Sequence, residues 1–176
     1  MNKILFFLMI TNFYILHLFA YEPTLAMLQT VYSNSNQKFS LRQSHFMCKA
    51  YGVISVDELY QESKQNSACK KGIDAFYRQN PRAKYYSARL LKLRQMYHVE
   101  FKNNRCIIYA KGLNTLSELL LAQGLAIKKT IFKDEEFNQV FEKAQIEAKE
   151  NNLGMYKNKI KYKCIAELFA IEQKNP

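Results

Sequence analysis

Four cysteines constrain the fold of this chain more than any other feature of its sequence. They are Cys48, Cys69, Cys106 and Cys164. None belongs to a Cys-x-x-Cys pair and no histidine stands at zinc-finger spacing, so a zinc site is not indicated. An even number of cysteines in an exported chain is typical of disulfides. We expect Cys48–Cys69, which closes a short local loop, and Cys106–Cys164, which would staple the C-terminal tail to the core.

The N-terminus has the layout of a secretory signal peptide. Lys3 precedes an uncharged and mostly apolar stretch from Ile4 to Ala20, which matches a charged n-region followed by an apolar h-region. The stretch is short for a bilayer span and polar residues interrupt it, which favours a cleaved signal. We expect cleavage after Ala20, no remaining transmembrane span, and a periplasmic or secreted protein. An uncleaved membrane anchor is the alternative.

The chain is strongly basic, with 26 Lys+Arg against 15 Asp+Glu and a formal net charge of +11. This balance indicates an anionic partner, such as nucleic acid, lipid head groups, a cell-wall polymer or an acidic protein. A merely solvated basic surface is the other interpretation. The part after the leader has the length of one ordinary domain, and scarce glycine and proline argue against disorder.

The first part of this domain reads mainly as strands. Polar residues 33–36 separate two strand-like runs, which is a hairpin signal. The expected strands are 24–32, 37–42 and 46–54, followed by a loop with one or two short helices over 57–79. Pro81 can open a helix over 83–96. That helix would place Ala83, Tyr86, Leu90, Leu93 and Tyr97 on one face.

The second part alternates strands and helices. We expect strands at 97–101 and 106–110, a helix over 115–123, a short edge strand over 125–130, a charged helix from Asp134 to Gly154, and a last docked helix in the tail. Gly124 suits a left-handed C-cap, and the acidic first turn after Asp134 complements the helix dipole. Segregated short strands with helices on one side predict a small β-barrel of the α+β class.

Several motifs of the second part resemble a known family. They are Ile108-Tyr-Ala-Lys-Gly112, Ala122-Gln-Gly-Leu-Ala126, the charged Ala-containing run Phe141–Lys149 and Leu153-Gly-Met-Tyr156. In this order and spacing they resemble the second half of a staphylococcal-nuclease-type (thermonuclease) domain, and Tyr86–Phe101 resembles the family more loosely. The resemblance implies a five-stranded OB-type β-barrel with about three helices. The domain would cover 21–156, and 157–176 would form a C-terminal helical extension.

Enzymes of this family hydrolyse DNA and RNA with a calcium ion held by carboxylates, a glutamate that assists the attacking water, and two arginines that stabilise charge on the phosphate. Set against that pattern, the turn at 33–36 has no carboxylate. Lys49 replaces the first arginine and cannot make the same bidentate hydrogen bonds to a phosphate. Ile54 occupies an aspartate position. Asp57 or Glu58 could stand in for the glutamate, and Arg105 for the second arginine.

The resemblance therefore implies a nuclease-like domain without its calcium ligands. We expect no cofactor, no nuclease activity and a role as a binding module that joins a protein partner in the cell envelope. The alternatives are an active calcium-dependent nuclease, including one with a relocated site of Asp57, Glu58, Glu62 and Asp74, and a non-catalytic nucleic-acid binder. A steep loss of DNA affinity with salt would indicate the binder.

Other candidates form a basic and aromatic surface. Its basic members are Arg82, Arg89, Lys92 and Arg94, with tyrosines at 85, 86 and 97. OB barrels bind single strands with such surfaces, although packing is an alternative role for Tyr86 and Tyr97. His45 and His98 are too few for a metal cluster, and we expect His98 to be structural.

Overall fold

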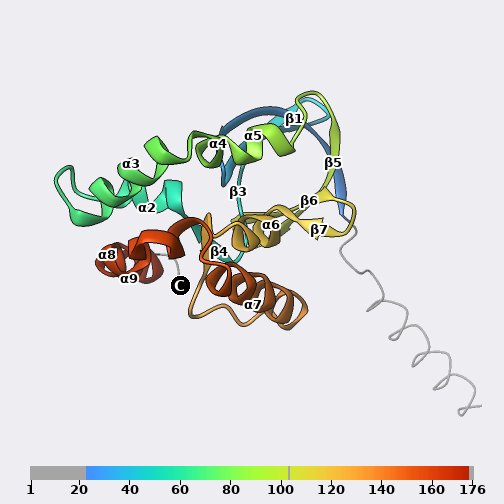
Figure 1. Cartoon of the computed structure of the whole chain (residues 1–176). Helices are drawn as coiled ribbons and strands as arrows, with labels where there is room; N and C mark the ends of the chain where they lie inside the picture. Colours follow the sequence, from blue (N-terminus) through green and yellow to red (C-terminus); the bar gives the residue numbers. More distant parts are fainter. Residues whose placement is uncertain (1–22, 103, 175–176) are drawn as a thin grey trace, which may run out of the picture.

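The computed structural model describes residues 23–102 and 104–174, so the expected signal peptide lies outside the described residues. The fold is of the mixed α+β class (Figure 1). A six-stranded sheet has the order β3-β2-β1-β5-β6-β7, and β4 pairs with β8 separately. The strands are β1 Thr24–Ser33, β2 Asn36–Leu41, β3 Ser44–Lys49, β4 Val53–Ser55, β5 Met96–Lys102, β6 Arg105–Lys111, β7 Asn114–Thr115 and β8 Ala126–Lys128.

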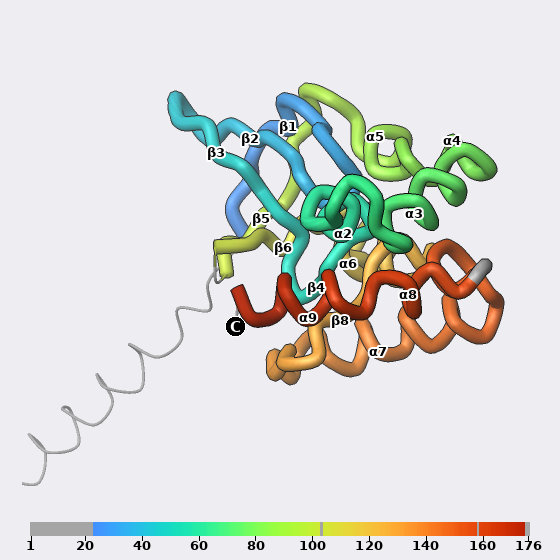
Figure 2. The backbone as a smooth tube through the Cα atoms, turned by 90° about the vertical axis from the view of Figure 1, so that its left-hand side faces the viewer, coloured from blue at the N-terminus to red at the C-terminus, as the bar shows by residue number. Residues whose placement is uncertain are grey.

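Helices cover one side of the strands and continue to the C-terminus (Figure 2). They are α2 Val56–Glu62, α3 Ala68–Gln79, α4 Pro81–Lys84, α5 Tyr86–Leu90, α6 Leu116–Ala122, α7 Glu135–Glu150, the 3-10 helix η1 Gly154–Lys159, α8 Ile160–Lys163 and α9 Ile165–Lys174. This is more helix than the three or so that the resemblance implies. In the described part of the chain, no helix is both long and apolar enough to cross a membrane.

The expected N-terminal hairpin is confirmed. β1 and β2 are antiparallel and join at the polar turn, with Ser33 opposite Asn36. Alternation along the strands sends Ala26, Leu28 and Phe39 into the core. The turn itself is buried, because the Asn34 side chain bonds to the chain around α5.

The expected continuous strand over 46–54 is wrong. β3 ends at Lys49, a single parallel bridge joins Ala50 to Cys106 on β6, and the chain then turns through Gly52 into β4. Gly52 has a φ of +70°, and a Cβ there would lie 2.5 Å from the Phe132 ring, so only glycine fits this turn.

The disulfides pair differently from our expectation. Cys48 bonds to Cys106, with 5.3 Å between their Cα atoms, and Cys69 bonds to Cys164, with 4.6 Å between theirs. The first bond spans β3 and β6, where the Ala50–Cys106 bridge already brings these strands together. The expected Cys48–Cys69 and Cys106–Cys164 pairs are wrong because long-range packing, rather than loop length, decides which cysteines meet.

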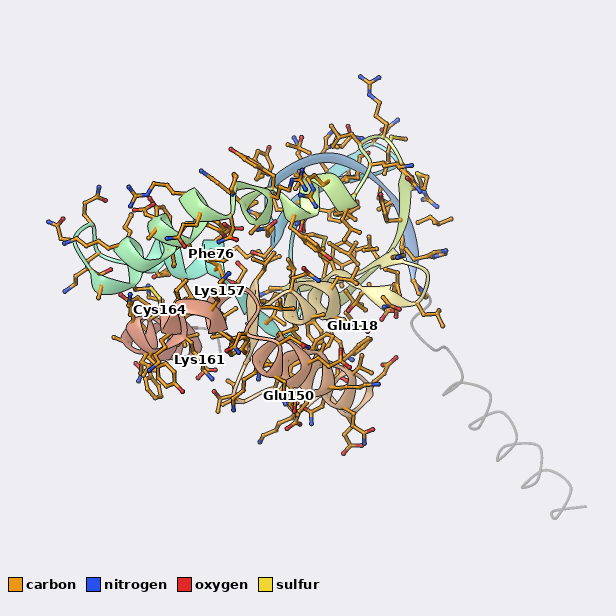
Figure 3. The ribbon with its side chains drawn as sticks, viewed as in Figure 1. Phe76, Glu118, Glu150, Lys157, Lys161 and Cys164 are labelled. Atoms are coloured by element: carbon orange, nitrogen blue, oxygen red, sulfur yellow. A yellow bond between two sulfur atoms is a disulfide. The ribbon has the colours of Figure 1, made fainter. Side chains whose placement is uncertain are left out.

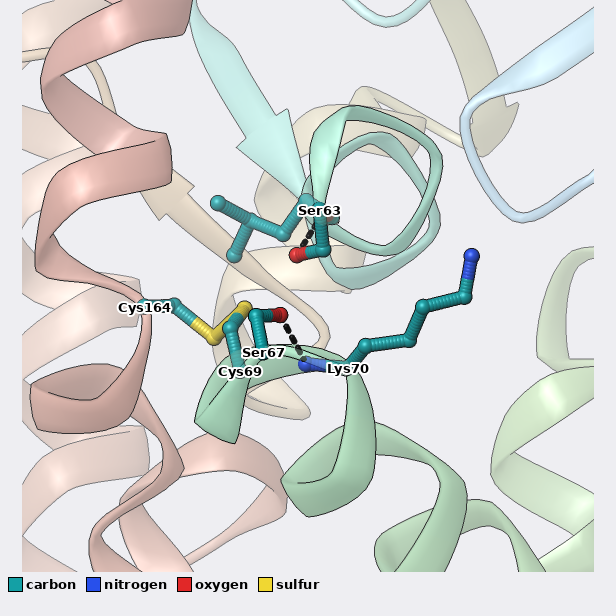
Figure 4. The surroundings of a disulfide bond; sticks show 6 residues. Ser63, Ser67, Cys69, Lys70 and Cys164 are labelled. Atoms are coloured by element: carbon teal, nitrogen blue, oxygen red, sulfur yellow. Dashed lines mark hydrogen bonds between the residues drawn. A yellow bond between two sulfur atoms is a disulfide. The ribbon is translucent and has the colours of Figure 1, made fainter. Parts of the chain in front are cut away.

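The segment at 57–79, where we expected a loop with one or two short helices, contains the two helices α2 and α3, which take up most of it. Ser55 and Ser67 cap α2 and α3 by accepting hydrogen bonds from Glu58 N–H and Lys70 N–H, both at 3.1 Å. α3 buries Cys69, Ile73 and Phe76 on one face, a helical spacing that was visible in the sequence. Its Cys69 is bonded to the C-terminal segment, as Figure 4 shows.

The single helix expected over 83–96 is also wrong. α4 ends at Lys84 and α5 ends at Leu90, and the following loop contains Arg94 with a φ of +60°. Tyr97 does not extend the helix but is buried in β5, and Leu93 is exposed.

Two glycines set the packing of the C-terminal half. Gly124 follows α6 with a φ of +61°, as expected of a C-cap. α7 ends at Glu150, four residues before the expected Gly154, and Asn152 carries the first left-handed φ after it. Gly154 instead opens η1 and lies against Gly124, whose carbonyl accepts the Met155 N–H at 2.9 Å. A Cβ on Gly124 would overlap the Leu153 carbonyl, and a Cβ on Gly154 would overlap the Gly124 carbonyl.

Candidate functional site

A hollow of about 1070 Å³ opens where β3, β5 and β6 meet the loop after β8. Its lining is Lys49, Tyr51, Gly52, Lys102, Asn104, Arg105, Lys129, Ile131, Phe132, Lys133, Asp134 and Lys174. Six of these side chains are cationic and one is acidic. We call this hollow the basic cleft. Such an excess of positive charge within a concave surface attracts and concentrates anions.

Arg105 lies at the start of β6 and is the most buried cation of the cleft, with 7% of its surface exposed. Its Nη1 donates to the carbonyl oxygens of Ala50 at 3.0 Å and Val53 at 3.1 Å. These bonds hold the chain where β3 turns into β4. The guanidinium is therefore used by the fold itself.

Glu58 forms an ion pair with Arg105. Arg105 Nη2 donates to Glu58 Oε1 at 2.7 Å, and Nη1 lies 3.4 Å from Oε2. The two side chains are 8% and 11% exposed, so the ion pair is buried. The structure thus brings together the two residues that the sequence suggested as charge stabiliser and base, but it pairs them with each other.

Lys129 lies close to this pair. Burial lowers the pKa of Lys129, the positive charge of Arg105 lowers it further, and Glu58 acts in the opposite direction. The charge of this lysine is therefore more easily lost than that of an exposed lysine.

Asp134 is the one acid of the cleft, and the sequence suggested it only as a helix start. It caps α7 by accepting the Glu136 N–H at 3.2 Å. It also accepts the Tyr51 hydroxyl at 2.8 Å and forms an ion pair with Lys102. Burial alone would raise the pKa of Asp134, but the bonds from Lys102 and Tyr51 outweigh it and lower the pKa. Burial and the contact with Asp134 raise the pKa of Tyr51.

Asp57 does not line the basic cleft. Its carboxylate accepts the Asn34 N–H at 2.8 Å and the Tyr77 hydroxyl at 2.7 Å, so it ties the β1–β2 turn to α3. Burial raises the pKa of Asp57, while these hydrogen bonds act against that rise. Asp57 is therefore a structural acceptor.

The positions where the resembled family has metal carboxylates are filled otherwise. Ser35 at the β1–β2 turn hydrogen-bonds to Ser55 at 2.6 Å, and Ile54 is fully buried. Glu62 pairs with Lys174 at 2.6 Å, and Asp74 hydrogen-bonds to Tyr60. Among the described residues, no three His, Cys, Asp or Glu side chains group as a metal site requires. The relocated site of Asp57, Glu58, Glu62 and Asp74 is therefore not assembled.

The second basic surface is only partly brought together. Arg82 and Arg89 line a hollow of about 470 Å³ together with Tyr86, while Lys92 and Arg94 lie in the loop before β5. Tyr97 is buried, and its hydroxyl accepts the Lys92 N–H at 2.7 Å. Packing is thus the role of Tyr97. His45 on β3 and His98 on β5 are both exposed, and β2 and β1 lie between these two strands in the sheet.

Several cleft residues were not suggested by the sequence. Lys102 is on β5, Lys129 and Lys133 are in the loop after β8, and Lys174 is on α9, and only the fold places these three segments together. The acid at a helix N-cap was the available signal for Asp134. Comparisons with known protein families and with characterised proteins find no match to this chain.

Proposed function

We propose that this protein is an exported, nuclease-like OB-type barrel that has lost catalysis and binds an anionic partner in the cell envelope through the basic cleft. Two disulfides suit an oxidising compartment outside the cytoplasm. The Ala50–Cys106 bridge and the Cys48–Cys106 bond draw β3 towards β6, as a barrel requires.

The observation that carries the proposal is the pairing of Arg105 with Glu58. A catalytic arginine must be able to donate to a phosphate, and a general base must be able to reach water. Here the buried guanidinium bonds to Glu58 and to two carbonyl oxygens. Catalysis would require breaking a buried ion pair that also holds the β3–β4 turn.

The exposed lysines of the cleft remain suited to binding. Lys49 and Lys133 are exposed at its rim, and Lys102 is offset by Asp134. A strand or loop carrying several carboxylates fits a row of lysines, since each lysine is a point charge that adapts to its partner. An acidic segment of an envelope protein is the partner we infer.

The test is a pair of assays on the exported form of the protein, purified with its disulfides formed. Incubation with single-stranded DNA, with calcium and with a chelator, should give no cleavage. Retention on an acidic peptide column should fall when Lys49 and Lys133 are both changed to Gln. The matched control changes Lys111 and Lys143 to Gln, which removes the same charge from exposed positions outside the cleft lining.

Each alternative has its own outcome. Calcium-dependent cleavage by the folded protein would establish an active nuclease and contradict the proposal. Salt-sensitive retention of DNA that exceeds retention of the acidic peptide would indicate the nucleic-acid binder instead. Equal retention of both cleft and control variants would show that the cleft is not the binding site.

A further inference from the structure

The C-terminal segment from η1 to α9 has one face that the fold already uses. Ile160, Cys164 and Ile171 on this face are 1%, 0% and 2% exposed. Cys164 is bonded to α3 through Cys69 (Figure 4). This face therefore accounts for the docking of the segment on the rest of the protein.

A second apolar stripe on the same helices has no such role. Ile165 and Phe169 are four residues apart on α9 and share one face of it, and Tyr162 precedes them on the short α8. They are 68%, 45% and 61% exposed. Exposed large side chains gathered in this way mark an interaction site more often than isolated ones do.

Lysines lie before and between the residues of this stripe in the chain, and of these Lys161 lines a hollow together with Ile165 and Phe169. Lys157, Lys159, Lys161 and Lys163 alternate through η1 and α8, and no acid occurs between Asn151 and Ala166. Within the described residues none of these four lysines forms an ion pair. Figure 3 shows Lys157 and Lys161 on the same C-terminal part of the molecule as Cys164. In η1 and α8 the charged residues are thus all lysines, and the acids Glu167 and Glu172 follow on α9.

The segment is held firmly, so the stripe is a formed surface. Besides the disulfide, Glu172 accepts the Thr130 N–H at 2.6 Å, and Lys174 pairs with Glu62 at 2.6 Å. Gly72 of α3 leaves room for the Lys163 stem, because a Cβ at Gly72 would lie 3.2 Å from Lys163 Cδ. No rearrangement is needed to expose Tyr162, Ile165 and Phe169.

We propose that this face, defined by the three apolar residues and the four lysines, binds the surface of an anionic phospholipid membrane. Apolar side chains of an interfacial helix enter the boundary between head groups and acyl chains, while lysines beside them attract anionic lipids. Exposed aromatic and aliphatic side chains together with lysines are the combination that an interfacial helix presents to an anionic lipid surface, so lipid is the partner we infer for this face.

This proposal shares only the export of the protein with the proposed function. It uses no residue of the Arg105–Glu58 pair and does not depend on the loss of catalysis. A membrane-bound tail would leave the basic cleft, on whose edge Lys174 lies, beside the lipid surface. The cleft could then meet a partner in the same envelope.

The experiment is vesicle co-sedimentation of the exported protein with intact disulfides. Vesicles of phosphatidylglycerol mixed with phosphatidylcholine are compared with pure phosphatidylcholine. Because a retained leader would bind lipid by itself, the N-terminus is first established by mass spectrometry, and all variants share it. Phe169→Ser should weaken binding about tenfold. Changing the four lysines to Gln should weaken it by up to about 600-fold, since each lysine near an anionic surface contributes a factor of about five.

Matched controls keep the test specific. Leu113→Ser removes the most exposed large apolar residue, at 88%, from the β6–β7 turn. A set of Lys38, Lys92, Arg94 and Lys111 changed to Gln removes four charges far along the chain from the tail. Both should bind as the unchanged protein does, and circular dichroism confirms that each variant is folded.

The outcomes separate the possibilities. Binding to anionic vesicles that the tail variants lose and the controls keep supports the proposal, whatever the nuclease assay gives. Absence of vesicle binding at about 0.15 M salt overturns it. If tail and control variants lose vesicle binding equally, net charge alone explains the binding and the proposal is overturned. Tail variants that keep vesicle binding but no longer retain an envelope protein would also overturn the proposal.

Discussion

Removing the Glu58 carboxylate should destabilise the protein strongly. In Glu58→Ala the Arg105 guanidinium keeps its bonds to Ala50 and Val53 but loses its counter-charge while only 8% exposed. Breaking a buried ion pair by removing one partner costs about 3–5 kcal/mol. Because two carbonyl oxygens remain bonded to Arg105, we expect the lower end, about 3 kcal/mol.

The assay is urea unfolding with intact disulfides, followed by far-ultraviolet circular dichroism. Glu62→Ala on the same helix is the matched control, because it removes an exposed ion pair. In that pair the Glu62 side chain is 38% exposed and the Lys174 side chain 62%. Exposed pairs contribute at most about 1 kcal/mol. If Glu58→Ala costs no more than Glu62→Ala, the pair is not buried and the reasoning that excludes Arg105 from catalysis fails.

Three further predictions concern the tail, the cleft acid and the glycine contact. Changing Cys69 and Cys164 together to Ser should lower the free energy of unfolding by about 2–4 kcal/mol, because their bond closes a long loop; an unchanged urea midpoint would contradict this. Asp134→Asn should lower stability by under about 1 kcal/mol, since solvent screens the pair with Lys102. The folded pKa of Asp134 is lowered, so its contribution is present above the unfolded pKa of about 3.8 and is lost as pH falls through the folded value; a difference from the variant that grows on acidification would refute it. Gly154→Ala should lower the free energy of unfolding by more than about 1 kcal/mol in a thermal unfolding experiment, because its Cβ would lie 2.2 Å from the carbonyl oxygen of Gly124; an unchanged stability would mean that the segments around Gly124 and Gly154 are not in contact.

Local signals predicted the local parts of the fold. The polar turn at 33–36 marked the first hairpin, Gly124 marked the end of α6, and Asp134 marked the start of α7. In each case one residue supplies a conformation or a hydrogen bond that the chain requires at that point. Such signals depend on few neighbours and can be read in sequence.

Long-range contacts explain what could not be predicted. Cys106 meets Cys48 because β6 reaches the end of β3, and Cys164 meets Cys69 because α8 packs on α3. Neither contact has a local signature. The interruption of the strand over 46–54 at Gly52 depends likewise on the distant Phe132 ring.

The candidate site was likewise predictable from the sequence only in part. Lys49 and Arg105 were suggested by a resemblance, and both line the basic cleft. That Arg105 would be neutralised by Glu58 depends on where α2 lies relative to β6, which spacing in the sequence does not reveal.

Calorimetric titration with calcium of the protein with its disulfides intact tests the central claim most directly. The described residues offer no grouping of carboxylates for this ion, and calcium sites in proteins use several oxygen ligands. We predict no saturable binding up to calcium concentrations on the order of 1 mM. A single saturable site that Glu58→Gln or Asp57→Asn abolishes in a folded protein would contradict the account and restore the nuclease.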